Sequence, residues 1–280
     1  MDTNKKQQLK ITATKARMGI IEGTYNAKSG HPGGSLSITD VLTYLYFEKM
    51  NIDPNEPDKK DRDRFVLSKG HAAPALYSVL ALRGFFSTDE IKKLRKPNEM
   101  LQGHPSISIP GVDMSTGSLG QGISTACGMA LAAKLDGAKY RVYAALGDGE
   151  IEEGQVWEAA MFAAHKKLDN LTIVVDFNNL QIDGTLDEVN SPCPIDEKFA
   201  AFGWDVTVID DGNDFDQIEK AFDHTSTVTG KPSVIIAKTA KGKGVSFMEN
   251  QVGWHGKAPD AAQYADAMNE LNAKLAELEG

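Results

Sequence analysis

The segment YRVYAALGDGE at positions 140–150 is an apolar run that ends in a glycine-bearing turn. A second segment of the same kind, LTIVVDFNN, occupies positions 171–179. Nearly continuous apolar runs are typical of parallel strands that are buried on both faces. The pattern predicts strands over 140–146 and 171–176, joined by a crossover helix over 155–167.

The second half of the chain continues this alternation. Further strands are predicted over 205–209 and 233–237, with a helix over 215–222 between them. The fold class is therefore α/β, with a doubly wound, mostly parallel sheet and helices on both faces. No linker or repeat divides the chain, so residues 1–280 are interpreted as a single domain with a C-terminal helix at about 260–279.

Three features of the predicted helices lead to expectations about helix packing or helix boundaries. The C-terminal helix has an apolar stripe from Tyr264 to Leu278, which is expected either to pack within the chain or to contact a partner. The predicted helix over 119–135 is rich in glycine and alanine, so we expect it to be buried on several sides or to contact a partner. Ser37 and Asp40 have the spacing of a capping box and predict a helix start at this point.

The overall charge limits the possible partners. The 30 basic and 39 acidic residues give a net charge of −9. Nucleic acids and anionic membranes attract basic surfaces, so neither is expected as a partner. A phosphate ligand is expected to be held by a metal, backbone amides and histidines rather than by bulk positive charge. The two cysteines form no framework, and the N-terminus has no apolar segment typical of a secretory signal, so a cytoplasmic location is expected.

Two polar motifs follow neighbouring predicted strands. Gly147-Asp148-Gly149 ends the first strand, and Asn178-Asn179 follows the second. Because carboxyl ends of parallel strands meet at one sheet edge, these motifs are expected to lie together. The Asp148 carboxylate, the Asn178 amide and the Leu180 carbonyl are oxygen ligands that suit Mg²⁺ or Ca²⁺ with a diphosphate. Each motif alone is also a common turn sequence, and their spacing favours the metal site.

Four of the six histidines stand next to glycine. These are His31, His71, His104 and His255, and their neighbours place them in loops. Imidazoles in such loops can hold phosphate oxygens or sugar hydroxyls and move protons near neutral pH. The other two, His165 and His224, fall within or at the ends of predicted helices and are interpreted as surface residues.

The chain contains short glycine- and histidine-bearing motifs in a particular order. They are SGHPG at 29–33, LSKGHA at 67–72, GHP at 103–105, TGSLGQG at 116–122, GDGE at 147–150, EG at 153–154, NN at 178–179, IDG at 182–184, KGKG at 241–244 and HG at 255–256. This series resembles the N-terminal, diphosphate-binding part of transketolase, a thiamine diphosphate enzyme. The resemblance extends from about residue 16 to residue 259 and implies the thiamine diphosphate-binding fold.

The resemblance implies a role for each candidate residue. The residues implied to hold the metal are Asp148, Asn178 and, through its carbonyl, Leu180. Those implied to bind the cofactor are His71, Gly117, Leu119, Gly149, Glu150, Asn178, Ile182 and His255. Those implied to face the sugar and assist proton transfer are His31, His104 and His255. Glu153 and Glu158 match positions at a subunit interface, with a solvated helix face as the alternative.

The resemblance also implies a partner. The family's full chain continues into a pyrimidine-binding domain that supplies the glutamate which activates the cofactor, and nothing after His255 resembles it. The implied protein is the N-terminal subunit of a split transketolase, assembled two plus two with a C-terminal subunit. It would transfer a two-carbon ketol unit from a ketose phosphate to an aldose phosphate. The alternatives are the corresponding part of 1-deoxyxylulose-5-phosphate synthase and a non-catalytic scaffold of the same fold.

Overall fold

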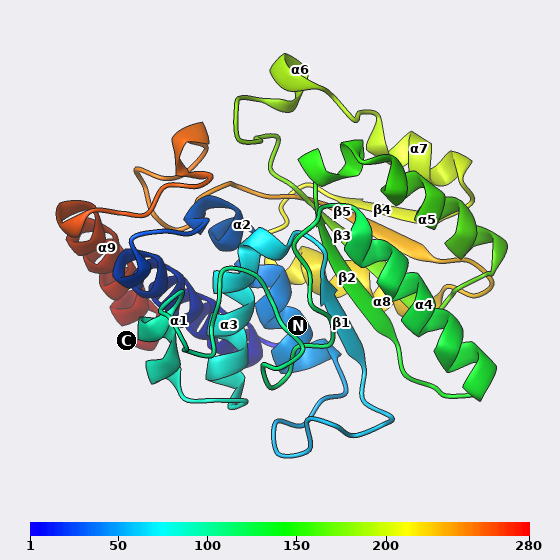
Figure 1. Cartoon of the computed structure of the whole chain (residues 1–280), viewed down its shortest axis with the longest axis horizontal. Helices are drawn as coiled ribbons and strands as arrows, with labels where there is room; N and C mark the ends of the chain where they lie inside the picture. Colours follow the sequence, from blue (N-terminus) through cyan, green and yellow to red (C-terminus); the bar gives the residue numbers. More distant parts are fainter.

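The computed structural model describes residues 1–280 and contains one five-stranded parallel sheet, seen at the centre of Figure 1. The strands are β1 (Arg64–Leu67), β2 (Val142–Gly147), β3 (Leu171–Phe177), β4 (Asp205–Ile209) and β5 (Ser233–Lys238). They lie in the order β1-β2-β3-β5-β4, and every neighbouring pair is parallel. The predicted parallel α/β sheet is confirmed, although the sequence pattern does not reveal β1.

Helices cover both faces of the sheet (Figure 1). The α-helices are α1 (Thr3–Ala27), α2 (Pro32–Tyr44), α3 (Ala73–Arg83), α4 (Gln121–Asp136), α5 (Gly154–His165), α6 (Leu186–Val189), α7 (Ile195–Ala201), α8 (Phe215–Thr227) and α9 (Ala261–Glu279). Shorter helical turns span Leu45–Lys49, Gly70–Ala72, Thr88–Lys93, Gly149–Glu152 and Val252–Trp254. None of the helices combines the length and the apolar character needed to cross a bilayer.

Alternate residues of the central strands pack against opposite layers. On β2, Val142, Ala144 and Leu146 join a core cluster with α4, α5 and α7. Tyr143 and Ala145 join the other cluster, with α1, α2, α3 and α8. Because neither face of the strand meets water, its sequence has no polar alternation, and this explains the continuous apolar run.

The C-terminal helix α9 packs against α1. Tyr264 stacks on Tyr25 with ring centroids 4.2 Å apart, and Leu271 of the apolar stripe is buried. Of the two expectations for this stripe, packing within the chain is therefore confirmed.

Helix α4 is buried on one face only. Ile123 and Ala130 face the sheet, whereas Leu135 is 77% exposed and Gly128 faces open space. The expectation of burial on several sides is wrong, because no second layer of this chain covers the outward face. The outward face of α4 is therefore open to solvent in this chain.

Helix α2 begins earlier than the capping-box pattern predicts. Its first residue is Pro32, with His31 at the N-cap, so Ser37 and Asp40 lie inside the helix. Both side chains bond to residues of other elements. The prediction of a helix start at Ser37 is therefore wrong, because tertiary contacts use the groups that would otherwise cap a helix.

Candidate functional site

A cavity of about 340 Å³ opens at the carboxyl ends of the strands. Loops after β1, β2, β3 and β5 contribute to its walls, together with the start of α2 and the residues before α4. The lining residues are His31, Gly34, Lys69, His71, Gly117, Leu119, Gly147, Asp148, Gly149, Glu150, Asn178, Leu180, Gln181, Ile182, Lys241 and His255. Every residue that the sequence assigns to the metal, cofactor or substrate lines this cavity, except His104. Open parallel sheets bind ligands at this edge.

Asp148 joins the two loops that carry the predicted metal ligands. It is 3% exposed, and its carboxylate accepts hydrogen bonds from the backbone N–H of Gly149 at 2.9 Å and of Asn179 at 2.6 Å. On the second loop, the Asn178 Oδ1 accepts from the Leu180 N–H at 3.2 Å. The GDG and NN motifs are thus brought together, as their positions after parallel strands predict.

The electrostatics of Asp148 favour a bound cation. Burial, with a smaller contribution from the Asp176 carboxylate, raises the pKa of Asp148 to about 6. A divalent cation stabilises such a buried charge. No group of three or more His, Cys, Asp or Glu side chains could hold a metal in this chain. A metal at this cavity would therefore be held by carboxylate, amide and carbonyl oxygens, which are the ligands of Mg²⁺ and Ca²⁺.

Three of the four loop histidines form a cluster. The ring centroids of His31, His71 and His255 lie 5.3 to 5.6 Å apart. Burial, followed by nearby positive charges, lowers the pKa of His31 to about 4 and that of His255 to about 3. Burial also lowers the pKa of His71 well below its usual value. All three imidazoles are therefore neutral at pH 7, and the His31 Nδ1 is buried without a hydrogen-bond partner.

The lowered pKa of His31 predicts a loss of stability as the pH falls from 6.5 toward about 4. In this window the unfolded chain binds a proton at the imidazole and the folded chain does not, so protonation favours unfolding. We expect a shallower pH dependence of the Tm in His31→Gln than in the wild type. His165→Gln, which changes an exposed ring, is the control with the wild-type slope. Equal slopes for all three proteins would contradict the assignment.

The fourth loop histidine, His104, does not line the cavity. Its ring lies beside Gly117, with Cδ2 3.5 Å from the position of a Cβ built on that glycine. Its carbonyl accepts a hydrogen bond from the Tyr77 hydroxyl at 2.8 Å. His104 is thus an exposed residue beside Gly117, outside the cavity lining but near enough to His31 for its charge to contribute to the lowered pKa of that imidazole.

Two buried lysines at the cavity are absent from the sequence-based assignment. Lys69 and Lys241 are each 1% exposed. Lys69 pairs with the fully buried Asp176, whereas the Lys241 Nζ lies 2.9 Å from the Leu180 carbonyl and 3.0 Å from the His255 Nδ1. Burial, followed by repulsion from Lys69, lowers the pKa of Lys241 to about 8.

These lysines place positive charge inside the cavity, which the expectation from the overall net charge does not include. The net charge of −9 describes the whole surface and says nothing about charges inside one cavity. A usable signal was present for Lys241 alone, because it follows the predicted strand over 233–237, beside glycine, at the edge where a parallel sheet gathers its ligand-binding residues.

The remaining predicted residues have the following positions. Glu150 lines the cavity, but both of its carboxylate oxygens are bonded to protein groups. Glu153 and Glu158 are exposed beside the outward face of α4 and α5. His165 is exposed, and His224 is 51% exposed and bonded to an aspartate, so both are surface residues as predicted.

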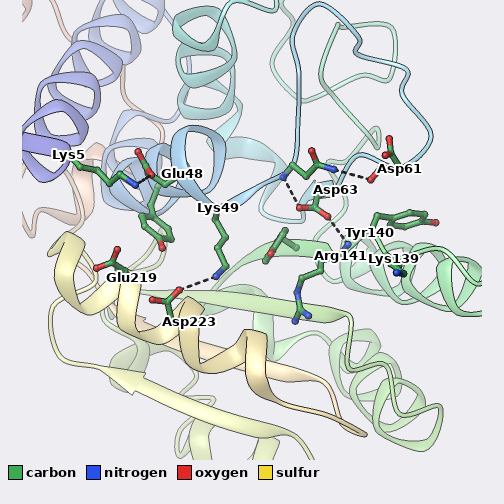
Figure 2. Close-up of a pocket in the computed structure, with 13 residues that line it drawn as sticks. Lys5, Glu48, Lys49, Asp61, Asp63, Lys139, Tyr140, Arg141, Glu219 and Asp223 are labelled. Atoms are coloured by element: carbon green, nitrogen blue, oxygen red, sulfur yellow. Dashed lines mark hydrogen bonds and ion pairs between the residues drawn. The ribbon is translucent and has the colours of Figure 1, made fainter. Parts of the chain in front are cut away.

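A second and larger cavity, of about 550 Å³, lies at the opposite edge of the sheet (Figure 2). Asp63 and Arg141, which line it, immediately precede β1 and β2. Charged groups in this cavity bond to one another, as Lys49 does to Asp223 at 3.2 Å. Its position at the amino ends of the strands leaves the smaller cavity as the candidate site.

Comparison with known proteins identifies the family. Residues 9–276 match the family model "Transketolase, thiamine diphosphate binding domain". The chain is 43% identical over 273 residues to one of the subunits of apulose-4-phosphate transketolase from Phocaeicola vulgatus, covering 98% of this chain and 97% of that protein. It is also 47% identical over 243 residues to a 6-deoxy-6-sulfo-D-fructose transketolase subunit from a Clostridium species. That match covers 86% of this chain and 88% of that protein.

Single-chain relatives match over part of their length. The structure of transketolase from Campylobacter jejuni superimposes with a TM-score of 0.90 at 32% identity, and the match covers 99% of this chain and 46% of that one. Human transketolase is 43% identical over 264 residues, covering 91% of this chain and 41% of the human protein. The chain thus spans less than half of these enzymes but nearly all of the two named subunits. It belongs to the transketolase family and corresponds to the family's thiamine diphosphate-binding domain.

Proposed function

We propose that this chain is the N-terminal subunit of a split transketolase. With a C-terminal subunit, it transfers a two-carbon ketol group from a ketose phosphate to an aldose phosphate. The observation that carries the proposal is one cavity that combines the Asp148 and Asn178 loops with two buried lysines and three neutral histidines. The near full-length match to two proteins named as transketolase subunits supports it.

The donors around the cavity fit thiamine diphosphate with a divalent metal. Asp148, Asn178 and the Leu180 carbonyl would hold Mg²⁺ or Ca²⁺, and Lys241 and His71 would contact diphosphate oxygens. Gly149 has no side chain, so the diphosphate can approach the backbone closely. Leu119, Gly117 and Ile182 would contact the cofactor beyond the diphosphate. When bound, the cofactor supplies the electron sink for breaking and forming the carbon–carbon bond.

Neutral histidines would bind the sugar substrate and transfer protons to and from it. His31 and His255 are half-buried imidazoles that are neutral at pH 7, so they can accept or donate a hydrogen bond to sugar hydroxyls and move protons. We assign His104 to the same task, from its exposed position beside Gly117, which lines the cavity. These groups act on the substrate, whereas the lysines and the metal ligands act on the diphosphate.

The partner would complete the site and cover its mouth. Leu119 and Ile182 line the cavity yet are 37% and 61% exposed, and Met161 on α5 is 59% exposed. We propose a two-plus-two assembly in which the outward face of α4 and α5, with Glu153 and Glu158, contacts other subunits. Such an obligate assembly buries more than the ~1,600 Å² of a standard interface. Both cysteines are free thiols, which suits the proposed cytoplasmic location.

An assay of the two-subunit complex tests the proposal. Ketol transfer between sugar phosphates is measured with thiamine diphosphate and Mg²⁺ present. Condensation of pyruvate with an aldose phosphate, without ketol transfer, would favour the 1-deoxyxylulose-5-phosphate synthase alternative. Failure of both reactions, with no cofactor binding, would favour the scaffold. The family match and the subunit names favour transketolase over both.

Substitutions of His71 and His104 are expected to affect different steps, cofactor binding and substrate turnover. His71→Ala should mainly weaken cofactor binding, because its imidazole lies in the cluster beside the diphosphate donors. His104→Ala should mainly lower kcat at saturating cofactor, because a hydroxyl contact that strengthens in the transition state affects the rate. Cofactor binding is measured as the thiamine diphosphate concentration that gives half of the maximal activity, and kcat is measured as the rate at saturating cofactor. A normal saturated rate in His104→Ala, with a raised cofactor requirement, would contradict this assignment.

A further inference from the structure

Glu150 brings three segments of the chain together on one carboxylate. The residue is 2% exposed and lies in the turn after β2. Its Oε1 accepts hydrogen bonds from the Ser68 hydroxyl and from the Gly120 N–H at 2.9 Å, and its Oε2 accepts from the Gly147 N–H at 3.0 Å. Two of the three partners are backbone N–H groups, which can only donate, so each carboxylate oxygen acts as an acceptor.

One of these bonds holds the loop that carries Leu119. Gly120 is the N-cap of α4 and has a φ of +79°, a backbone conformation that favours glycine. Two residues later, Gly122 lies so close to Ser68 that a Cβ would come within 2.7 Å of its Cα. The bond to Glu150 and this close packing together determine where Leu119 enters the cavity wall.

The other two bonds reach the charged side of the cavity. Gly147 directly precedes Asp148, and Ser68 directly precedes Lys69. Both Asp148 and Lys69 line the cavity. Glu150 therefore connects the wall that carries Leu119 with the strand ends that carry the charged groups.

We propose that Glu150 is a positioning residue whose carboxylate sets the spacing between the Leu119 wall and the Asp148 strand end. The inference rests on the proposed thiamine diphosphate site, because a ligand that spans both walls binds best when they are already correctly spaced. It replaces the sequence-based assignment of Glu150 to direct cofactor contact. Both oxygens of this carboxylate are used within the chain.

Glutamine cannot reproduce this arrangement. If its oxygen faces Ser68 and Gly120, its NH₂ group points at the Gly147 N–H. If the amide is reversed, its NH₂ group points at the Gly120 N–H. One donor therefore faces another donor in either orientation, and a backbone amide is left unpaired. Aspartate keeps the charge but is one methylene shorter, so it cannot reach all three donors.

The test compares Glu150→Gln and Glu150→Asp with the wild type, each in complex with the C-terminal subunit. Calorimetry with Mg²⁺ measures the Kd for thiamine diphosphate, and hydrogen exchange of the ligand-free chain measures amide protection over residues 116–122. We expect both variants to bind at least about tenfold more weakly, as when an outer partner of a metal site is removed. Exchange should accelerate over 116–122 and stay unchanged in α8. Glu197→Gln, an exposed glutamate on α7, is the matched control.

Other outcomes would overturn the proposal. Wild-type affinity in Glu150→Gln would show that the bonds are dispensable, and wild-type affinity in Glu150→Asp alone would show that charge rather than spacing matters. If neither variant folds, Ser68→Ala removes one donor, and we expect about threefold weaker binding, the low end of what one lost hydrogen bond costs, with faster exchange at Gly120. Unchanged binding and exchange in that variant would reject the role. A wild type that binds no thiamine diphosphate would refute the proposed function, while the exchange data would still test the positioning role of Glu150.

Discussion

Asp148→Ala is expected to abolish retention of thiamine diphosphate. The carboxylate is the one charged ligand in the proposed metal set, because the Asn178 amide and the Leu180 carbonyl are neutral. Without it, the metal loses its anionic ligand, and the diphosphate loses the cation that screens it from Asp176 and Glu150. The loss should far exceed the ~10–100-fold that is typical of outer-shell changes at metal sites. The Kd for the cofactor, measured with Mg²⁺ and the C-terminal subunit present, gives the result.

Two further variants make this experiment specific. Asp148→Asn keeps the size but removes the charge, and its single oxygen can accept from only one of the Gly149 and Asn179 amides, so it should also fail to retain the cofactor. Asp196→Ala, at an exposed carboxylate on α7, should bind normally. Unchanged affinity in Asp148→Ala would remove Asp148 from the metal set.

The second large effect concerns the partner. The purified chain, supplied with thiamine diphosphate and Mg²⁺, is expected to show no ketol transfer until the C-terminal subunit is added. Leu119 and Ile182 leave the cavity mouth open to water, and we propose that the C-terminal subunit supplies the group that activates the cofactor. Loss of one such acid–base group alone costs about 10²–10⁴-fold in rate.

The measurement is the ketol-transfer rate before and after the C-terminal subunit is added, with the assembly mass recorded in parallel. The expected assembly contains two copies of each chain. Full activity of the chain by itself would refute the split-enzyme proposal, since the activating group would then have to lie within this chain. If activity appears only with the partner but the complex does not contain two copies of each chain, the proposed two-plus-two assembly is wrong and the proposed function still holds.

The parallel sheet and the Asp148 loop could be predicted from local signals. Segments 140–146 and 171–176 are apolar throughout, and each is followed by a polar turn, so their strand ends had to meet at one edge. The strand β1, only four residues long, gave no comparable signal because its apolar run is too short for a period to be recognised. Residues 64–67 are therefore recognised as a strand only from their parallel pairing with β2 in the structure.

The sequence by itself determined the fold class, the GDG and NN loops, and the placement of the glycine-flanked histidines in loops, because these depend on neighbours in the chain. The tertiary structure alone decided that Lys69 and Lys241 are buried in the cavity, that His104 lies beside Gly117 and outside the cavity lining, and that Glu150 bonds within the protein. The reason is that the burial and pairing of a polar side chain depend on partners far away in sequence. Lys69 lies 107 positions from Asp176, and Glu150 lies 82 from Ser68, so no local pattern records these contacts.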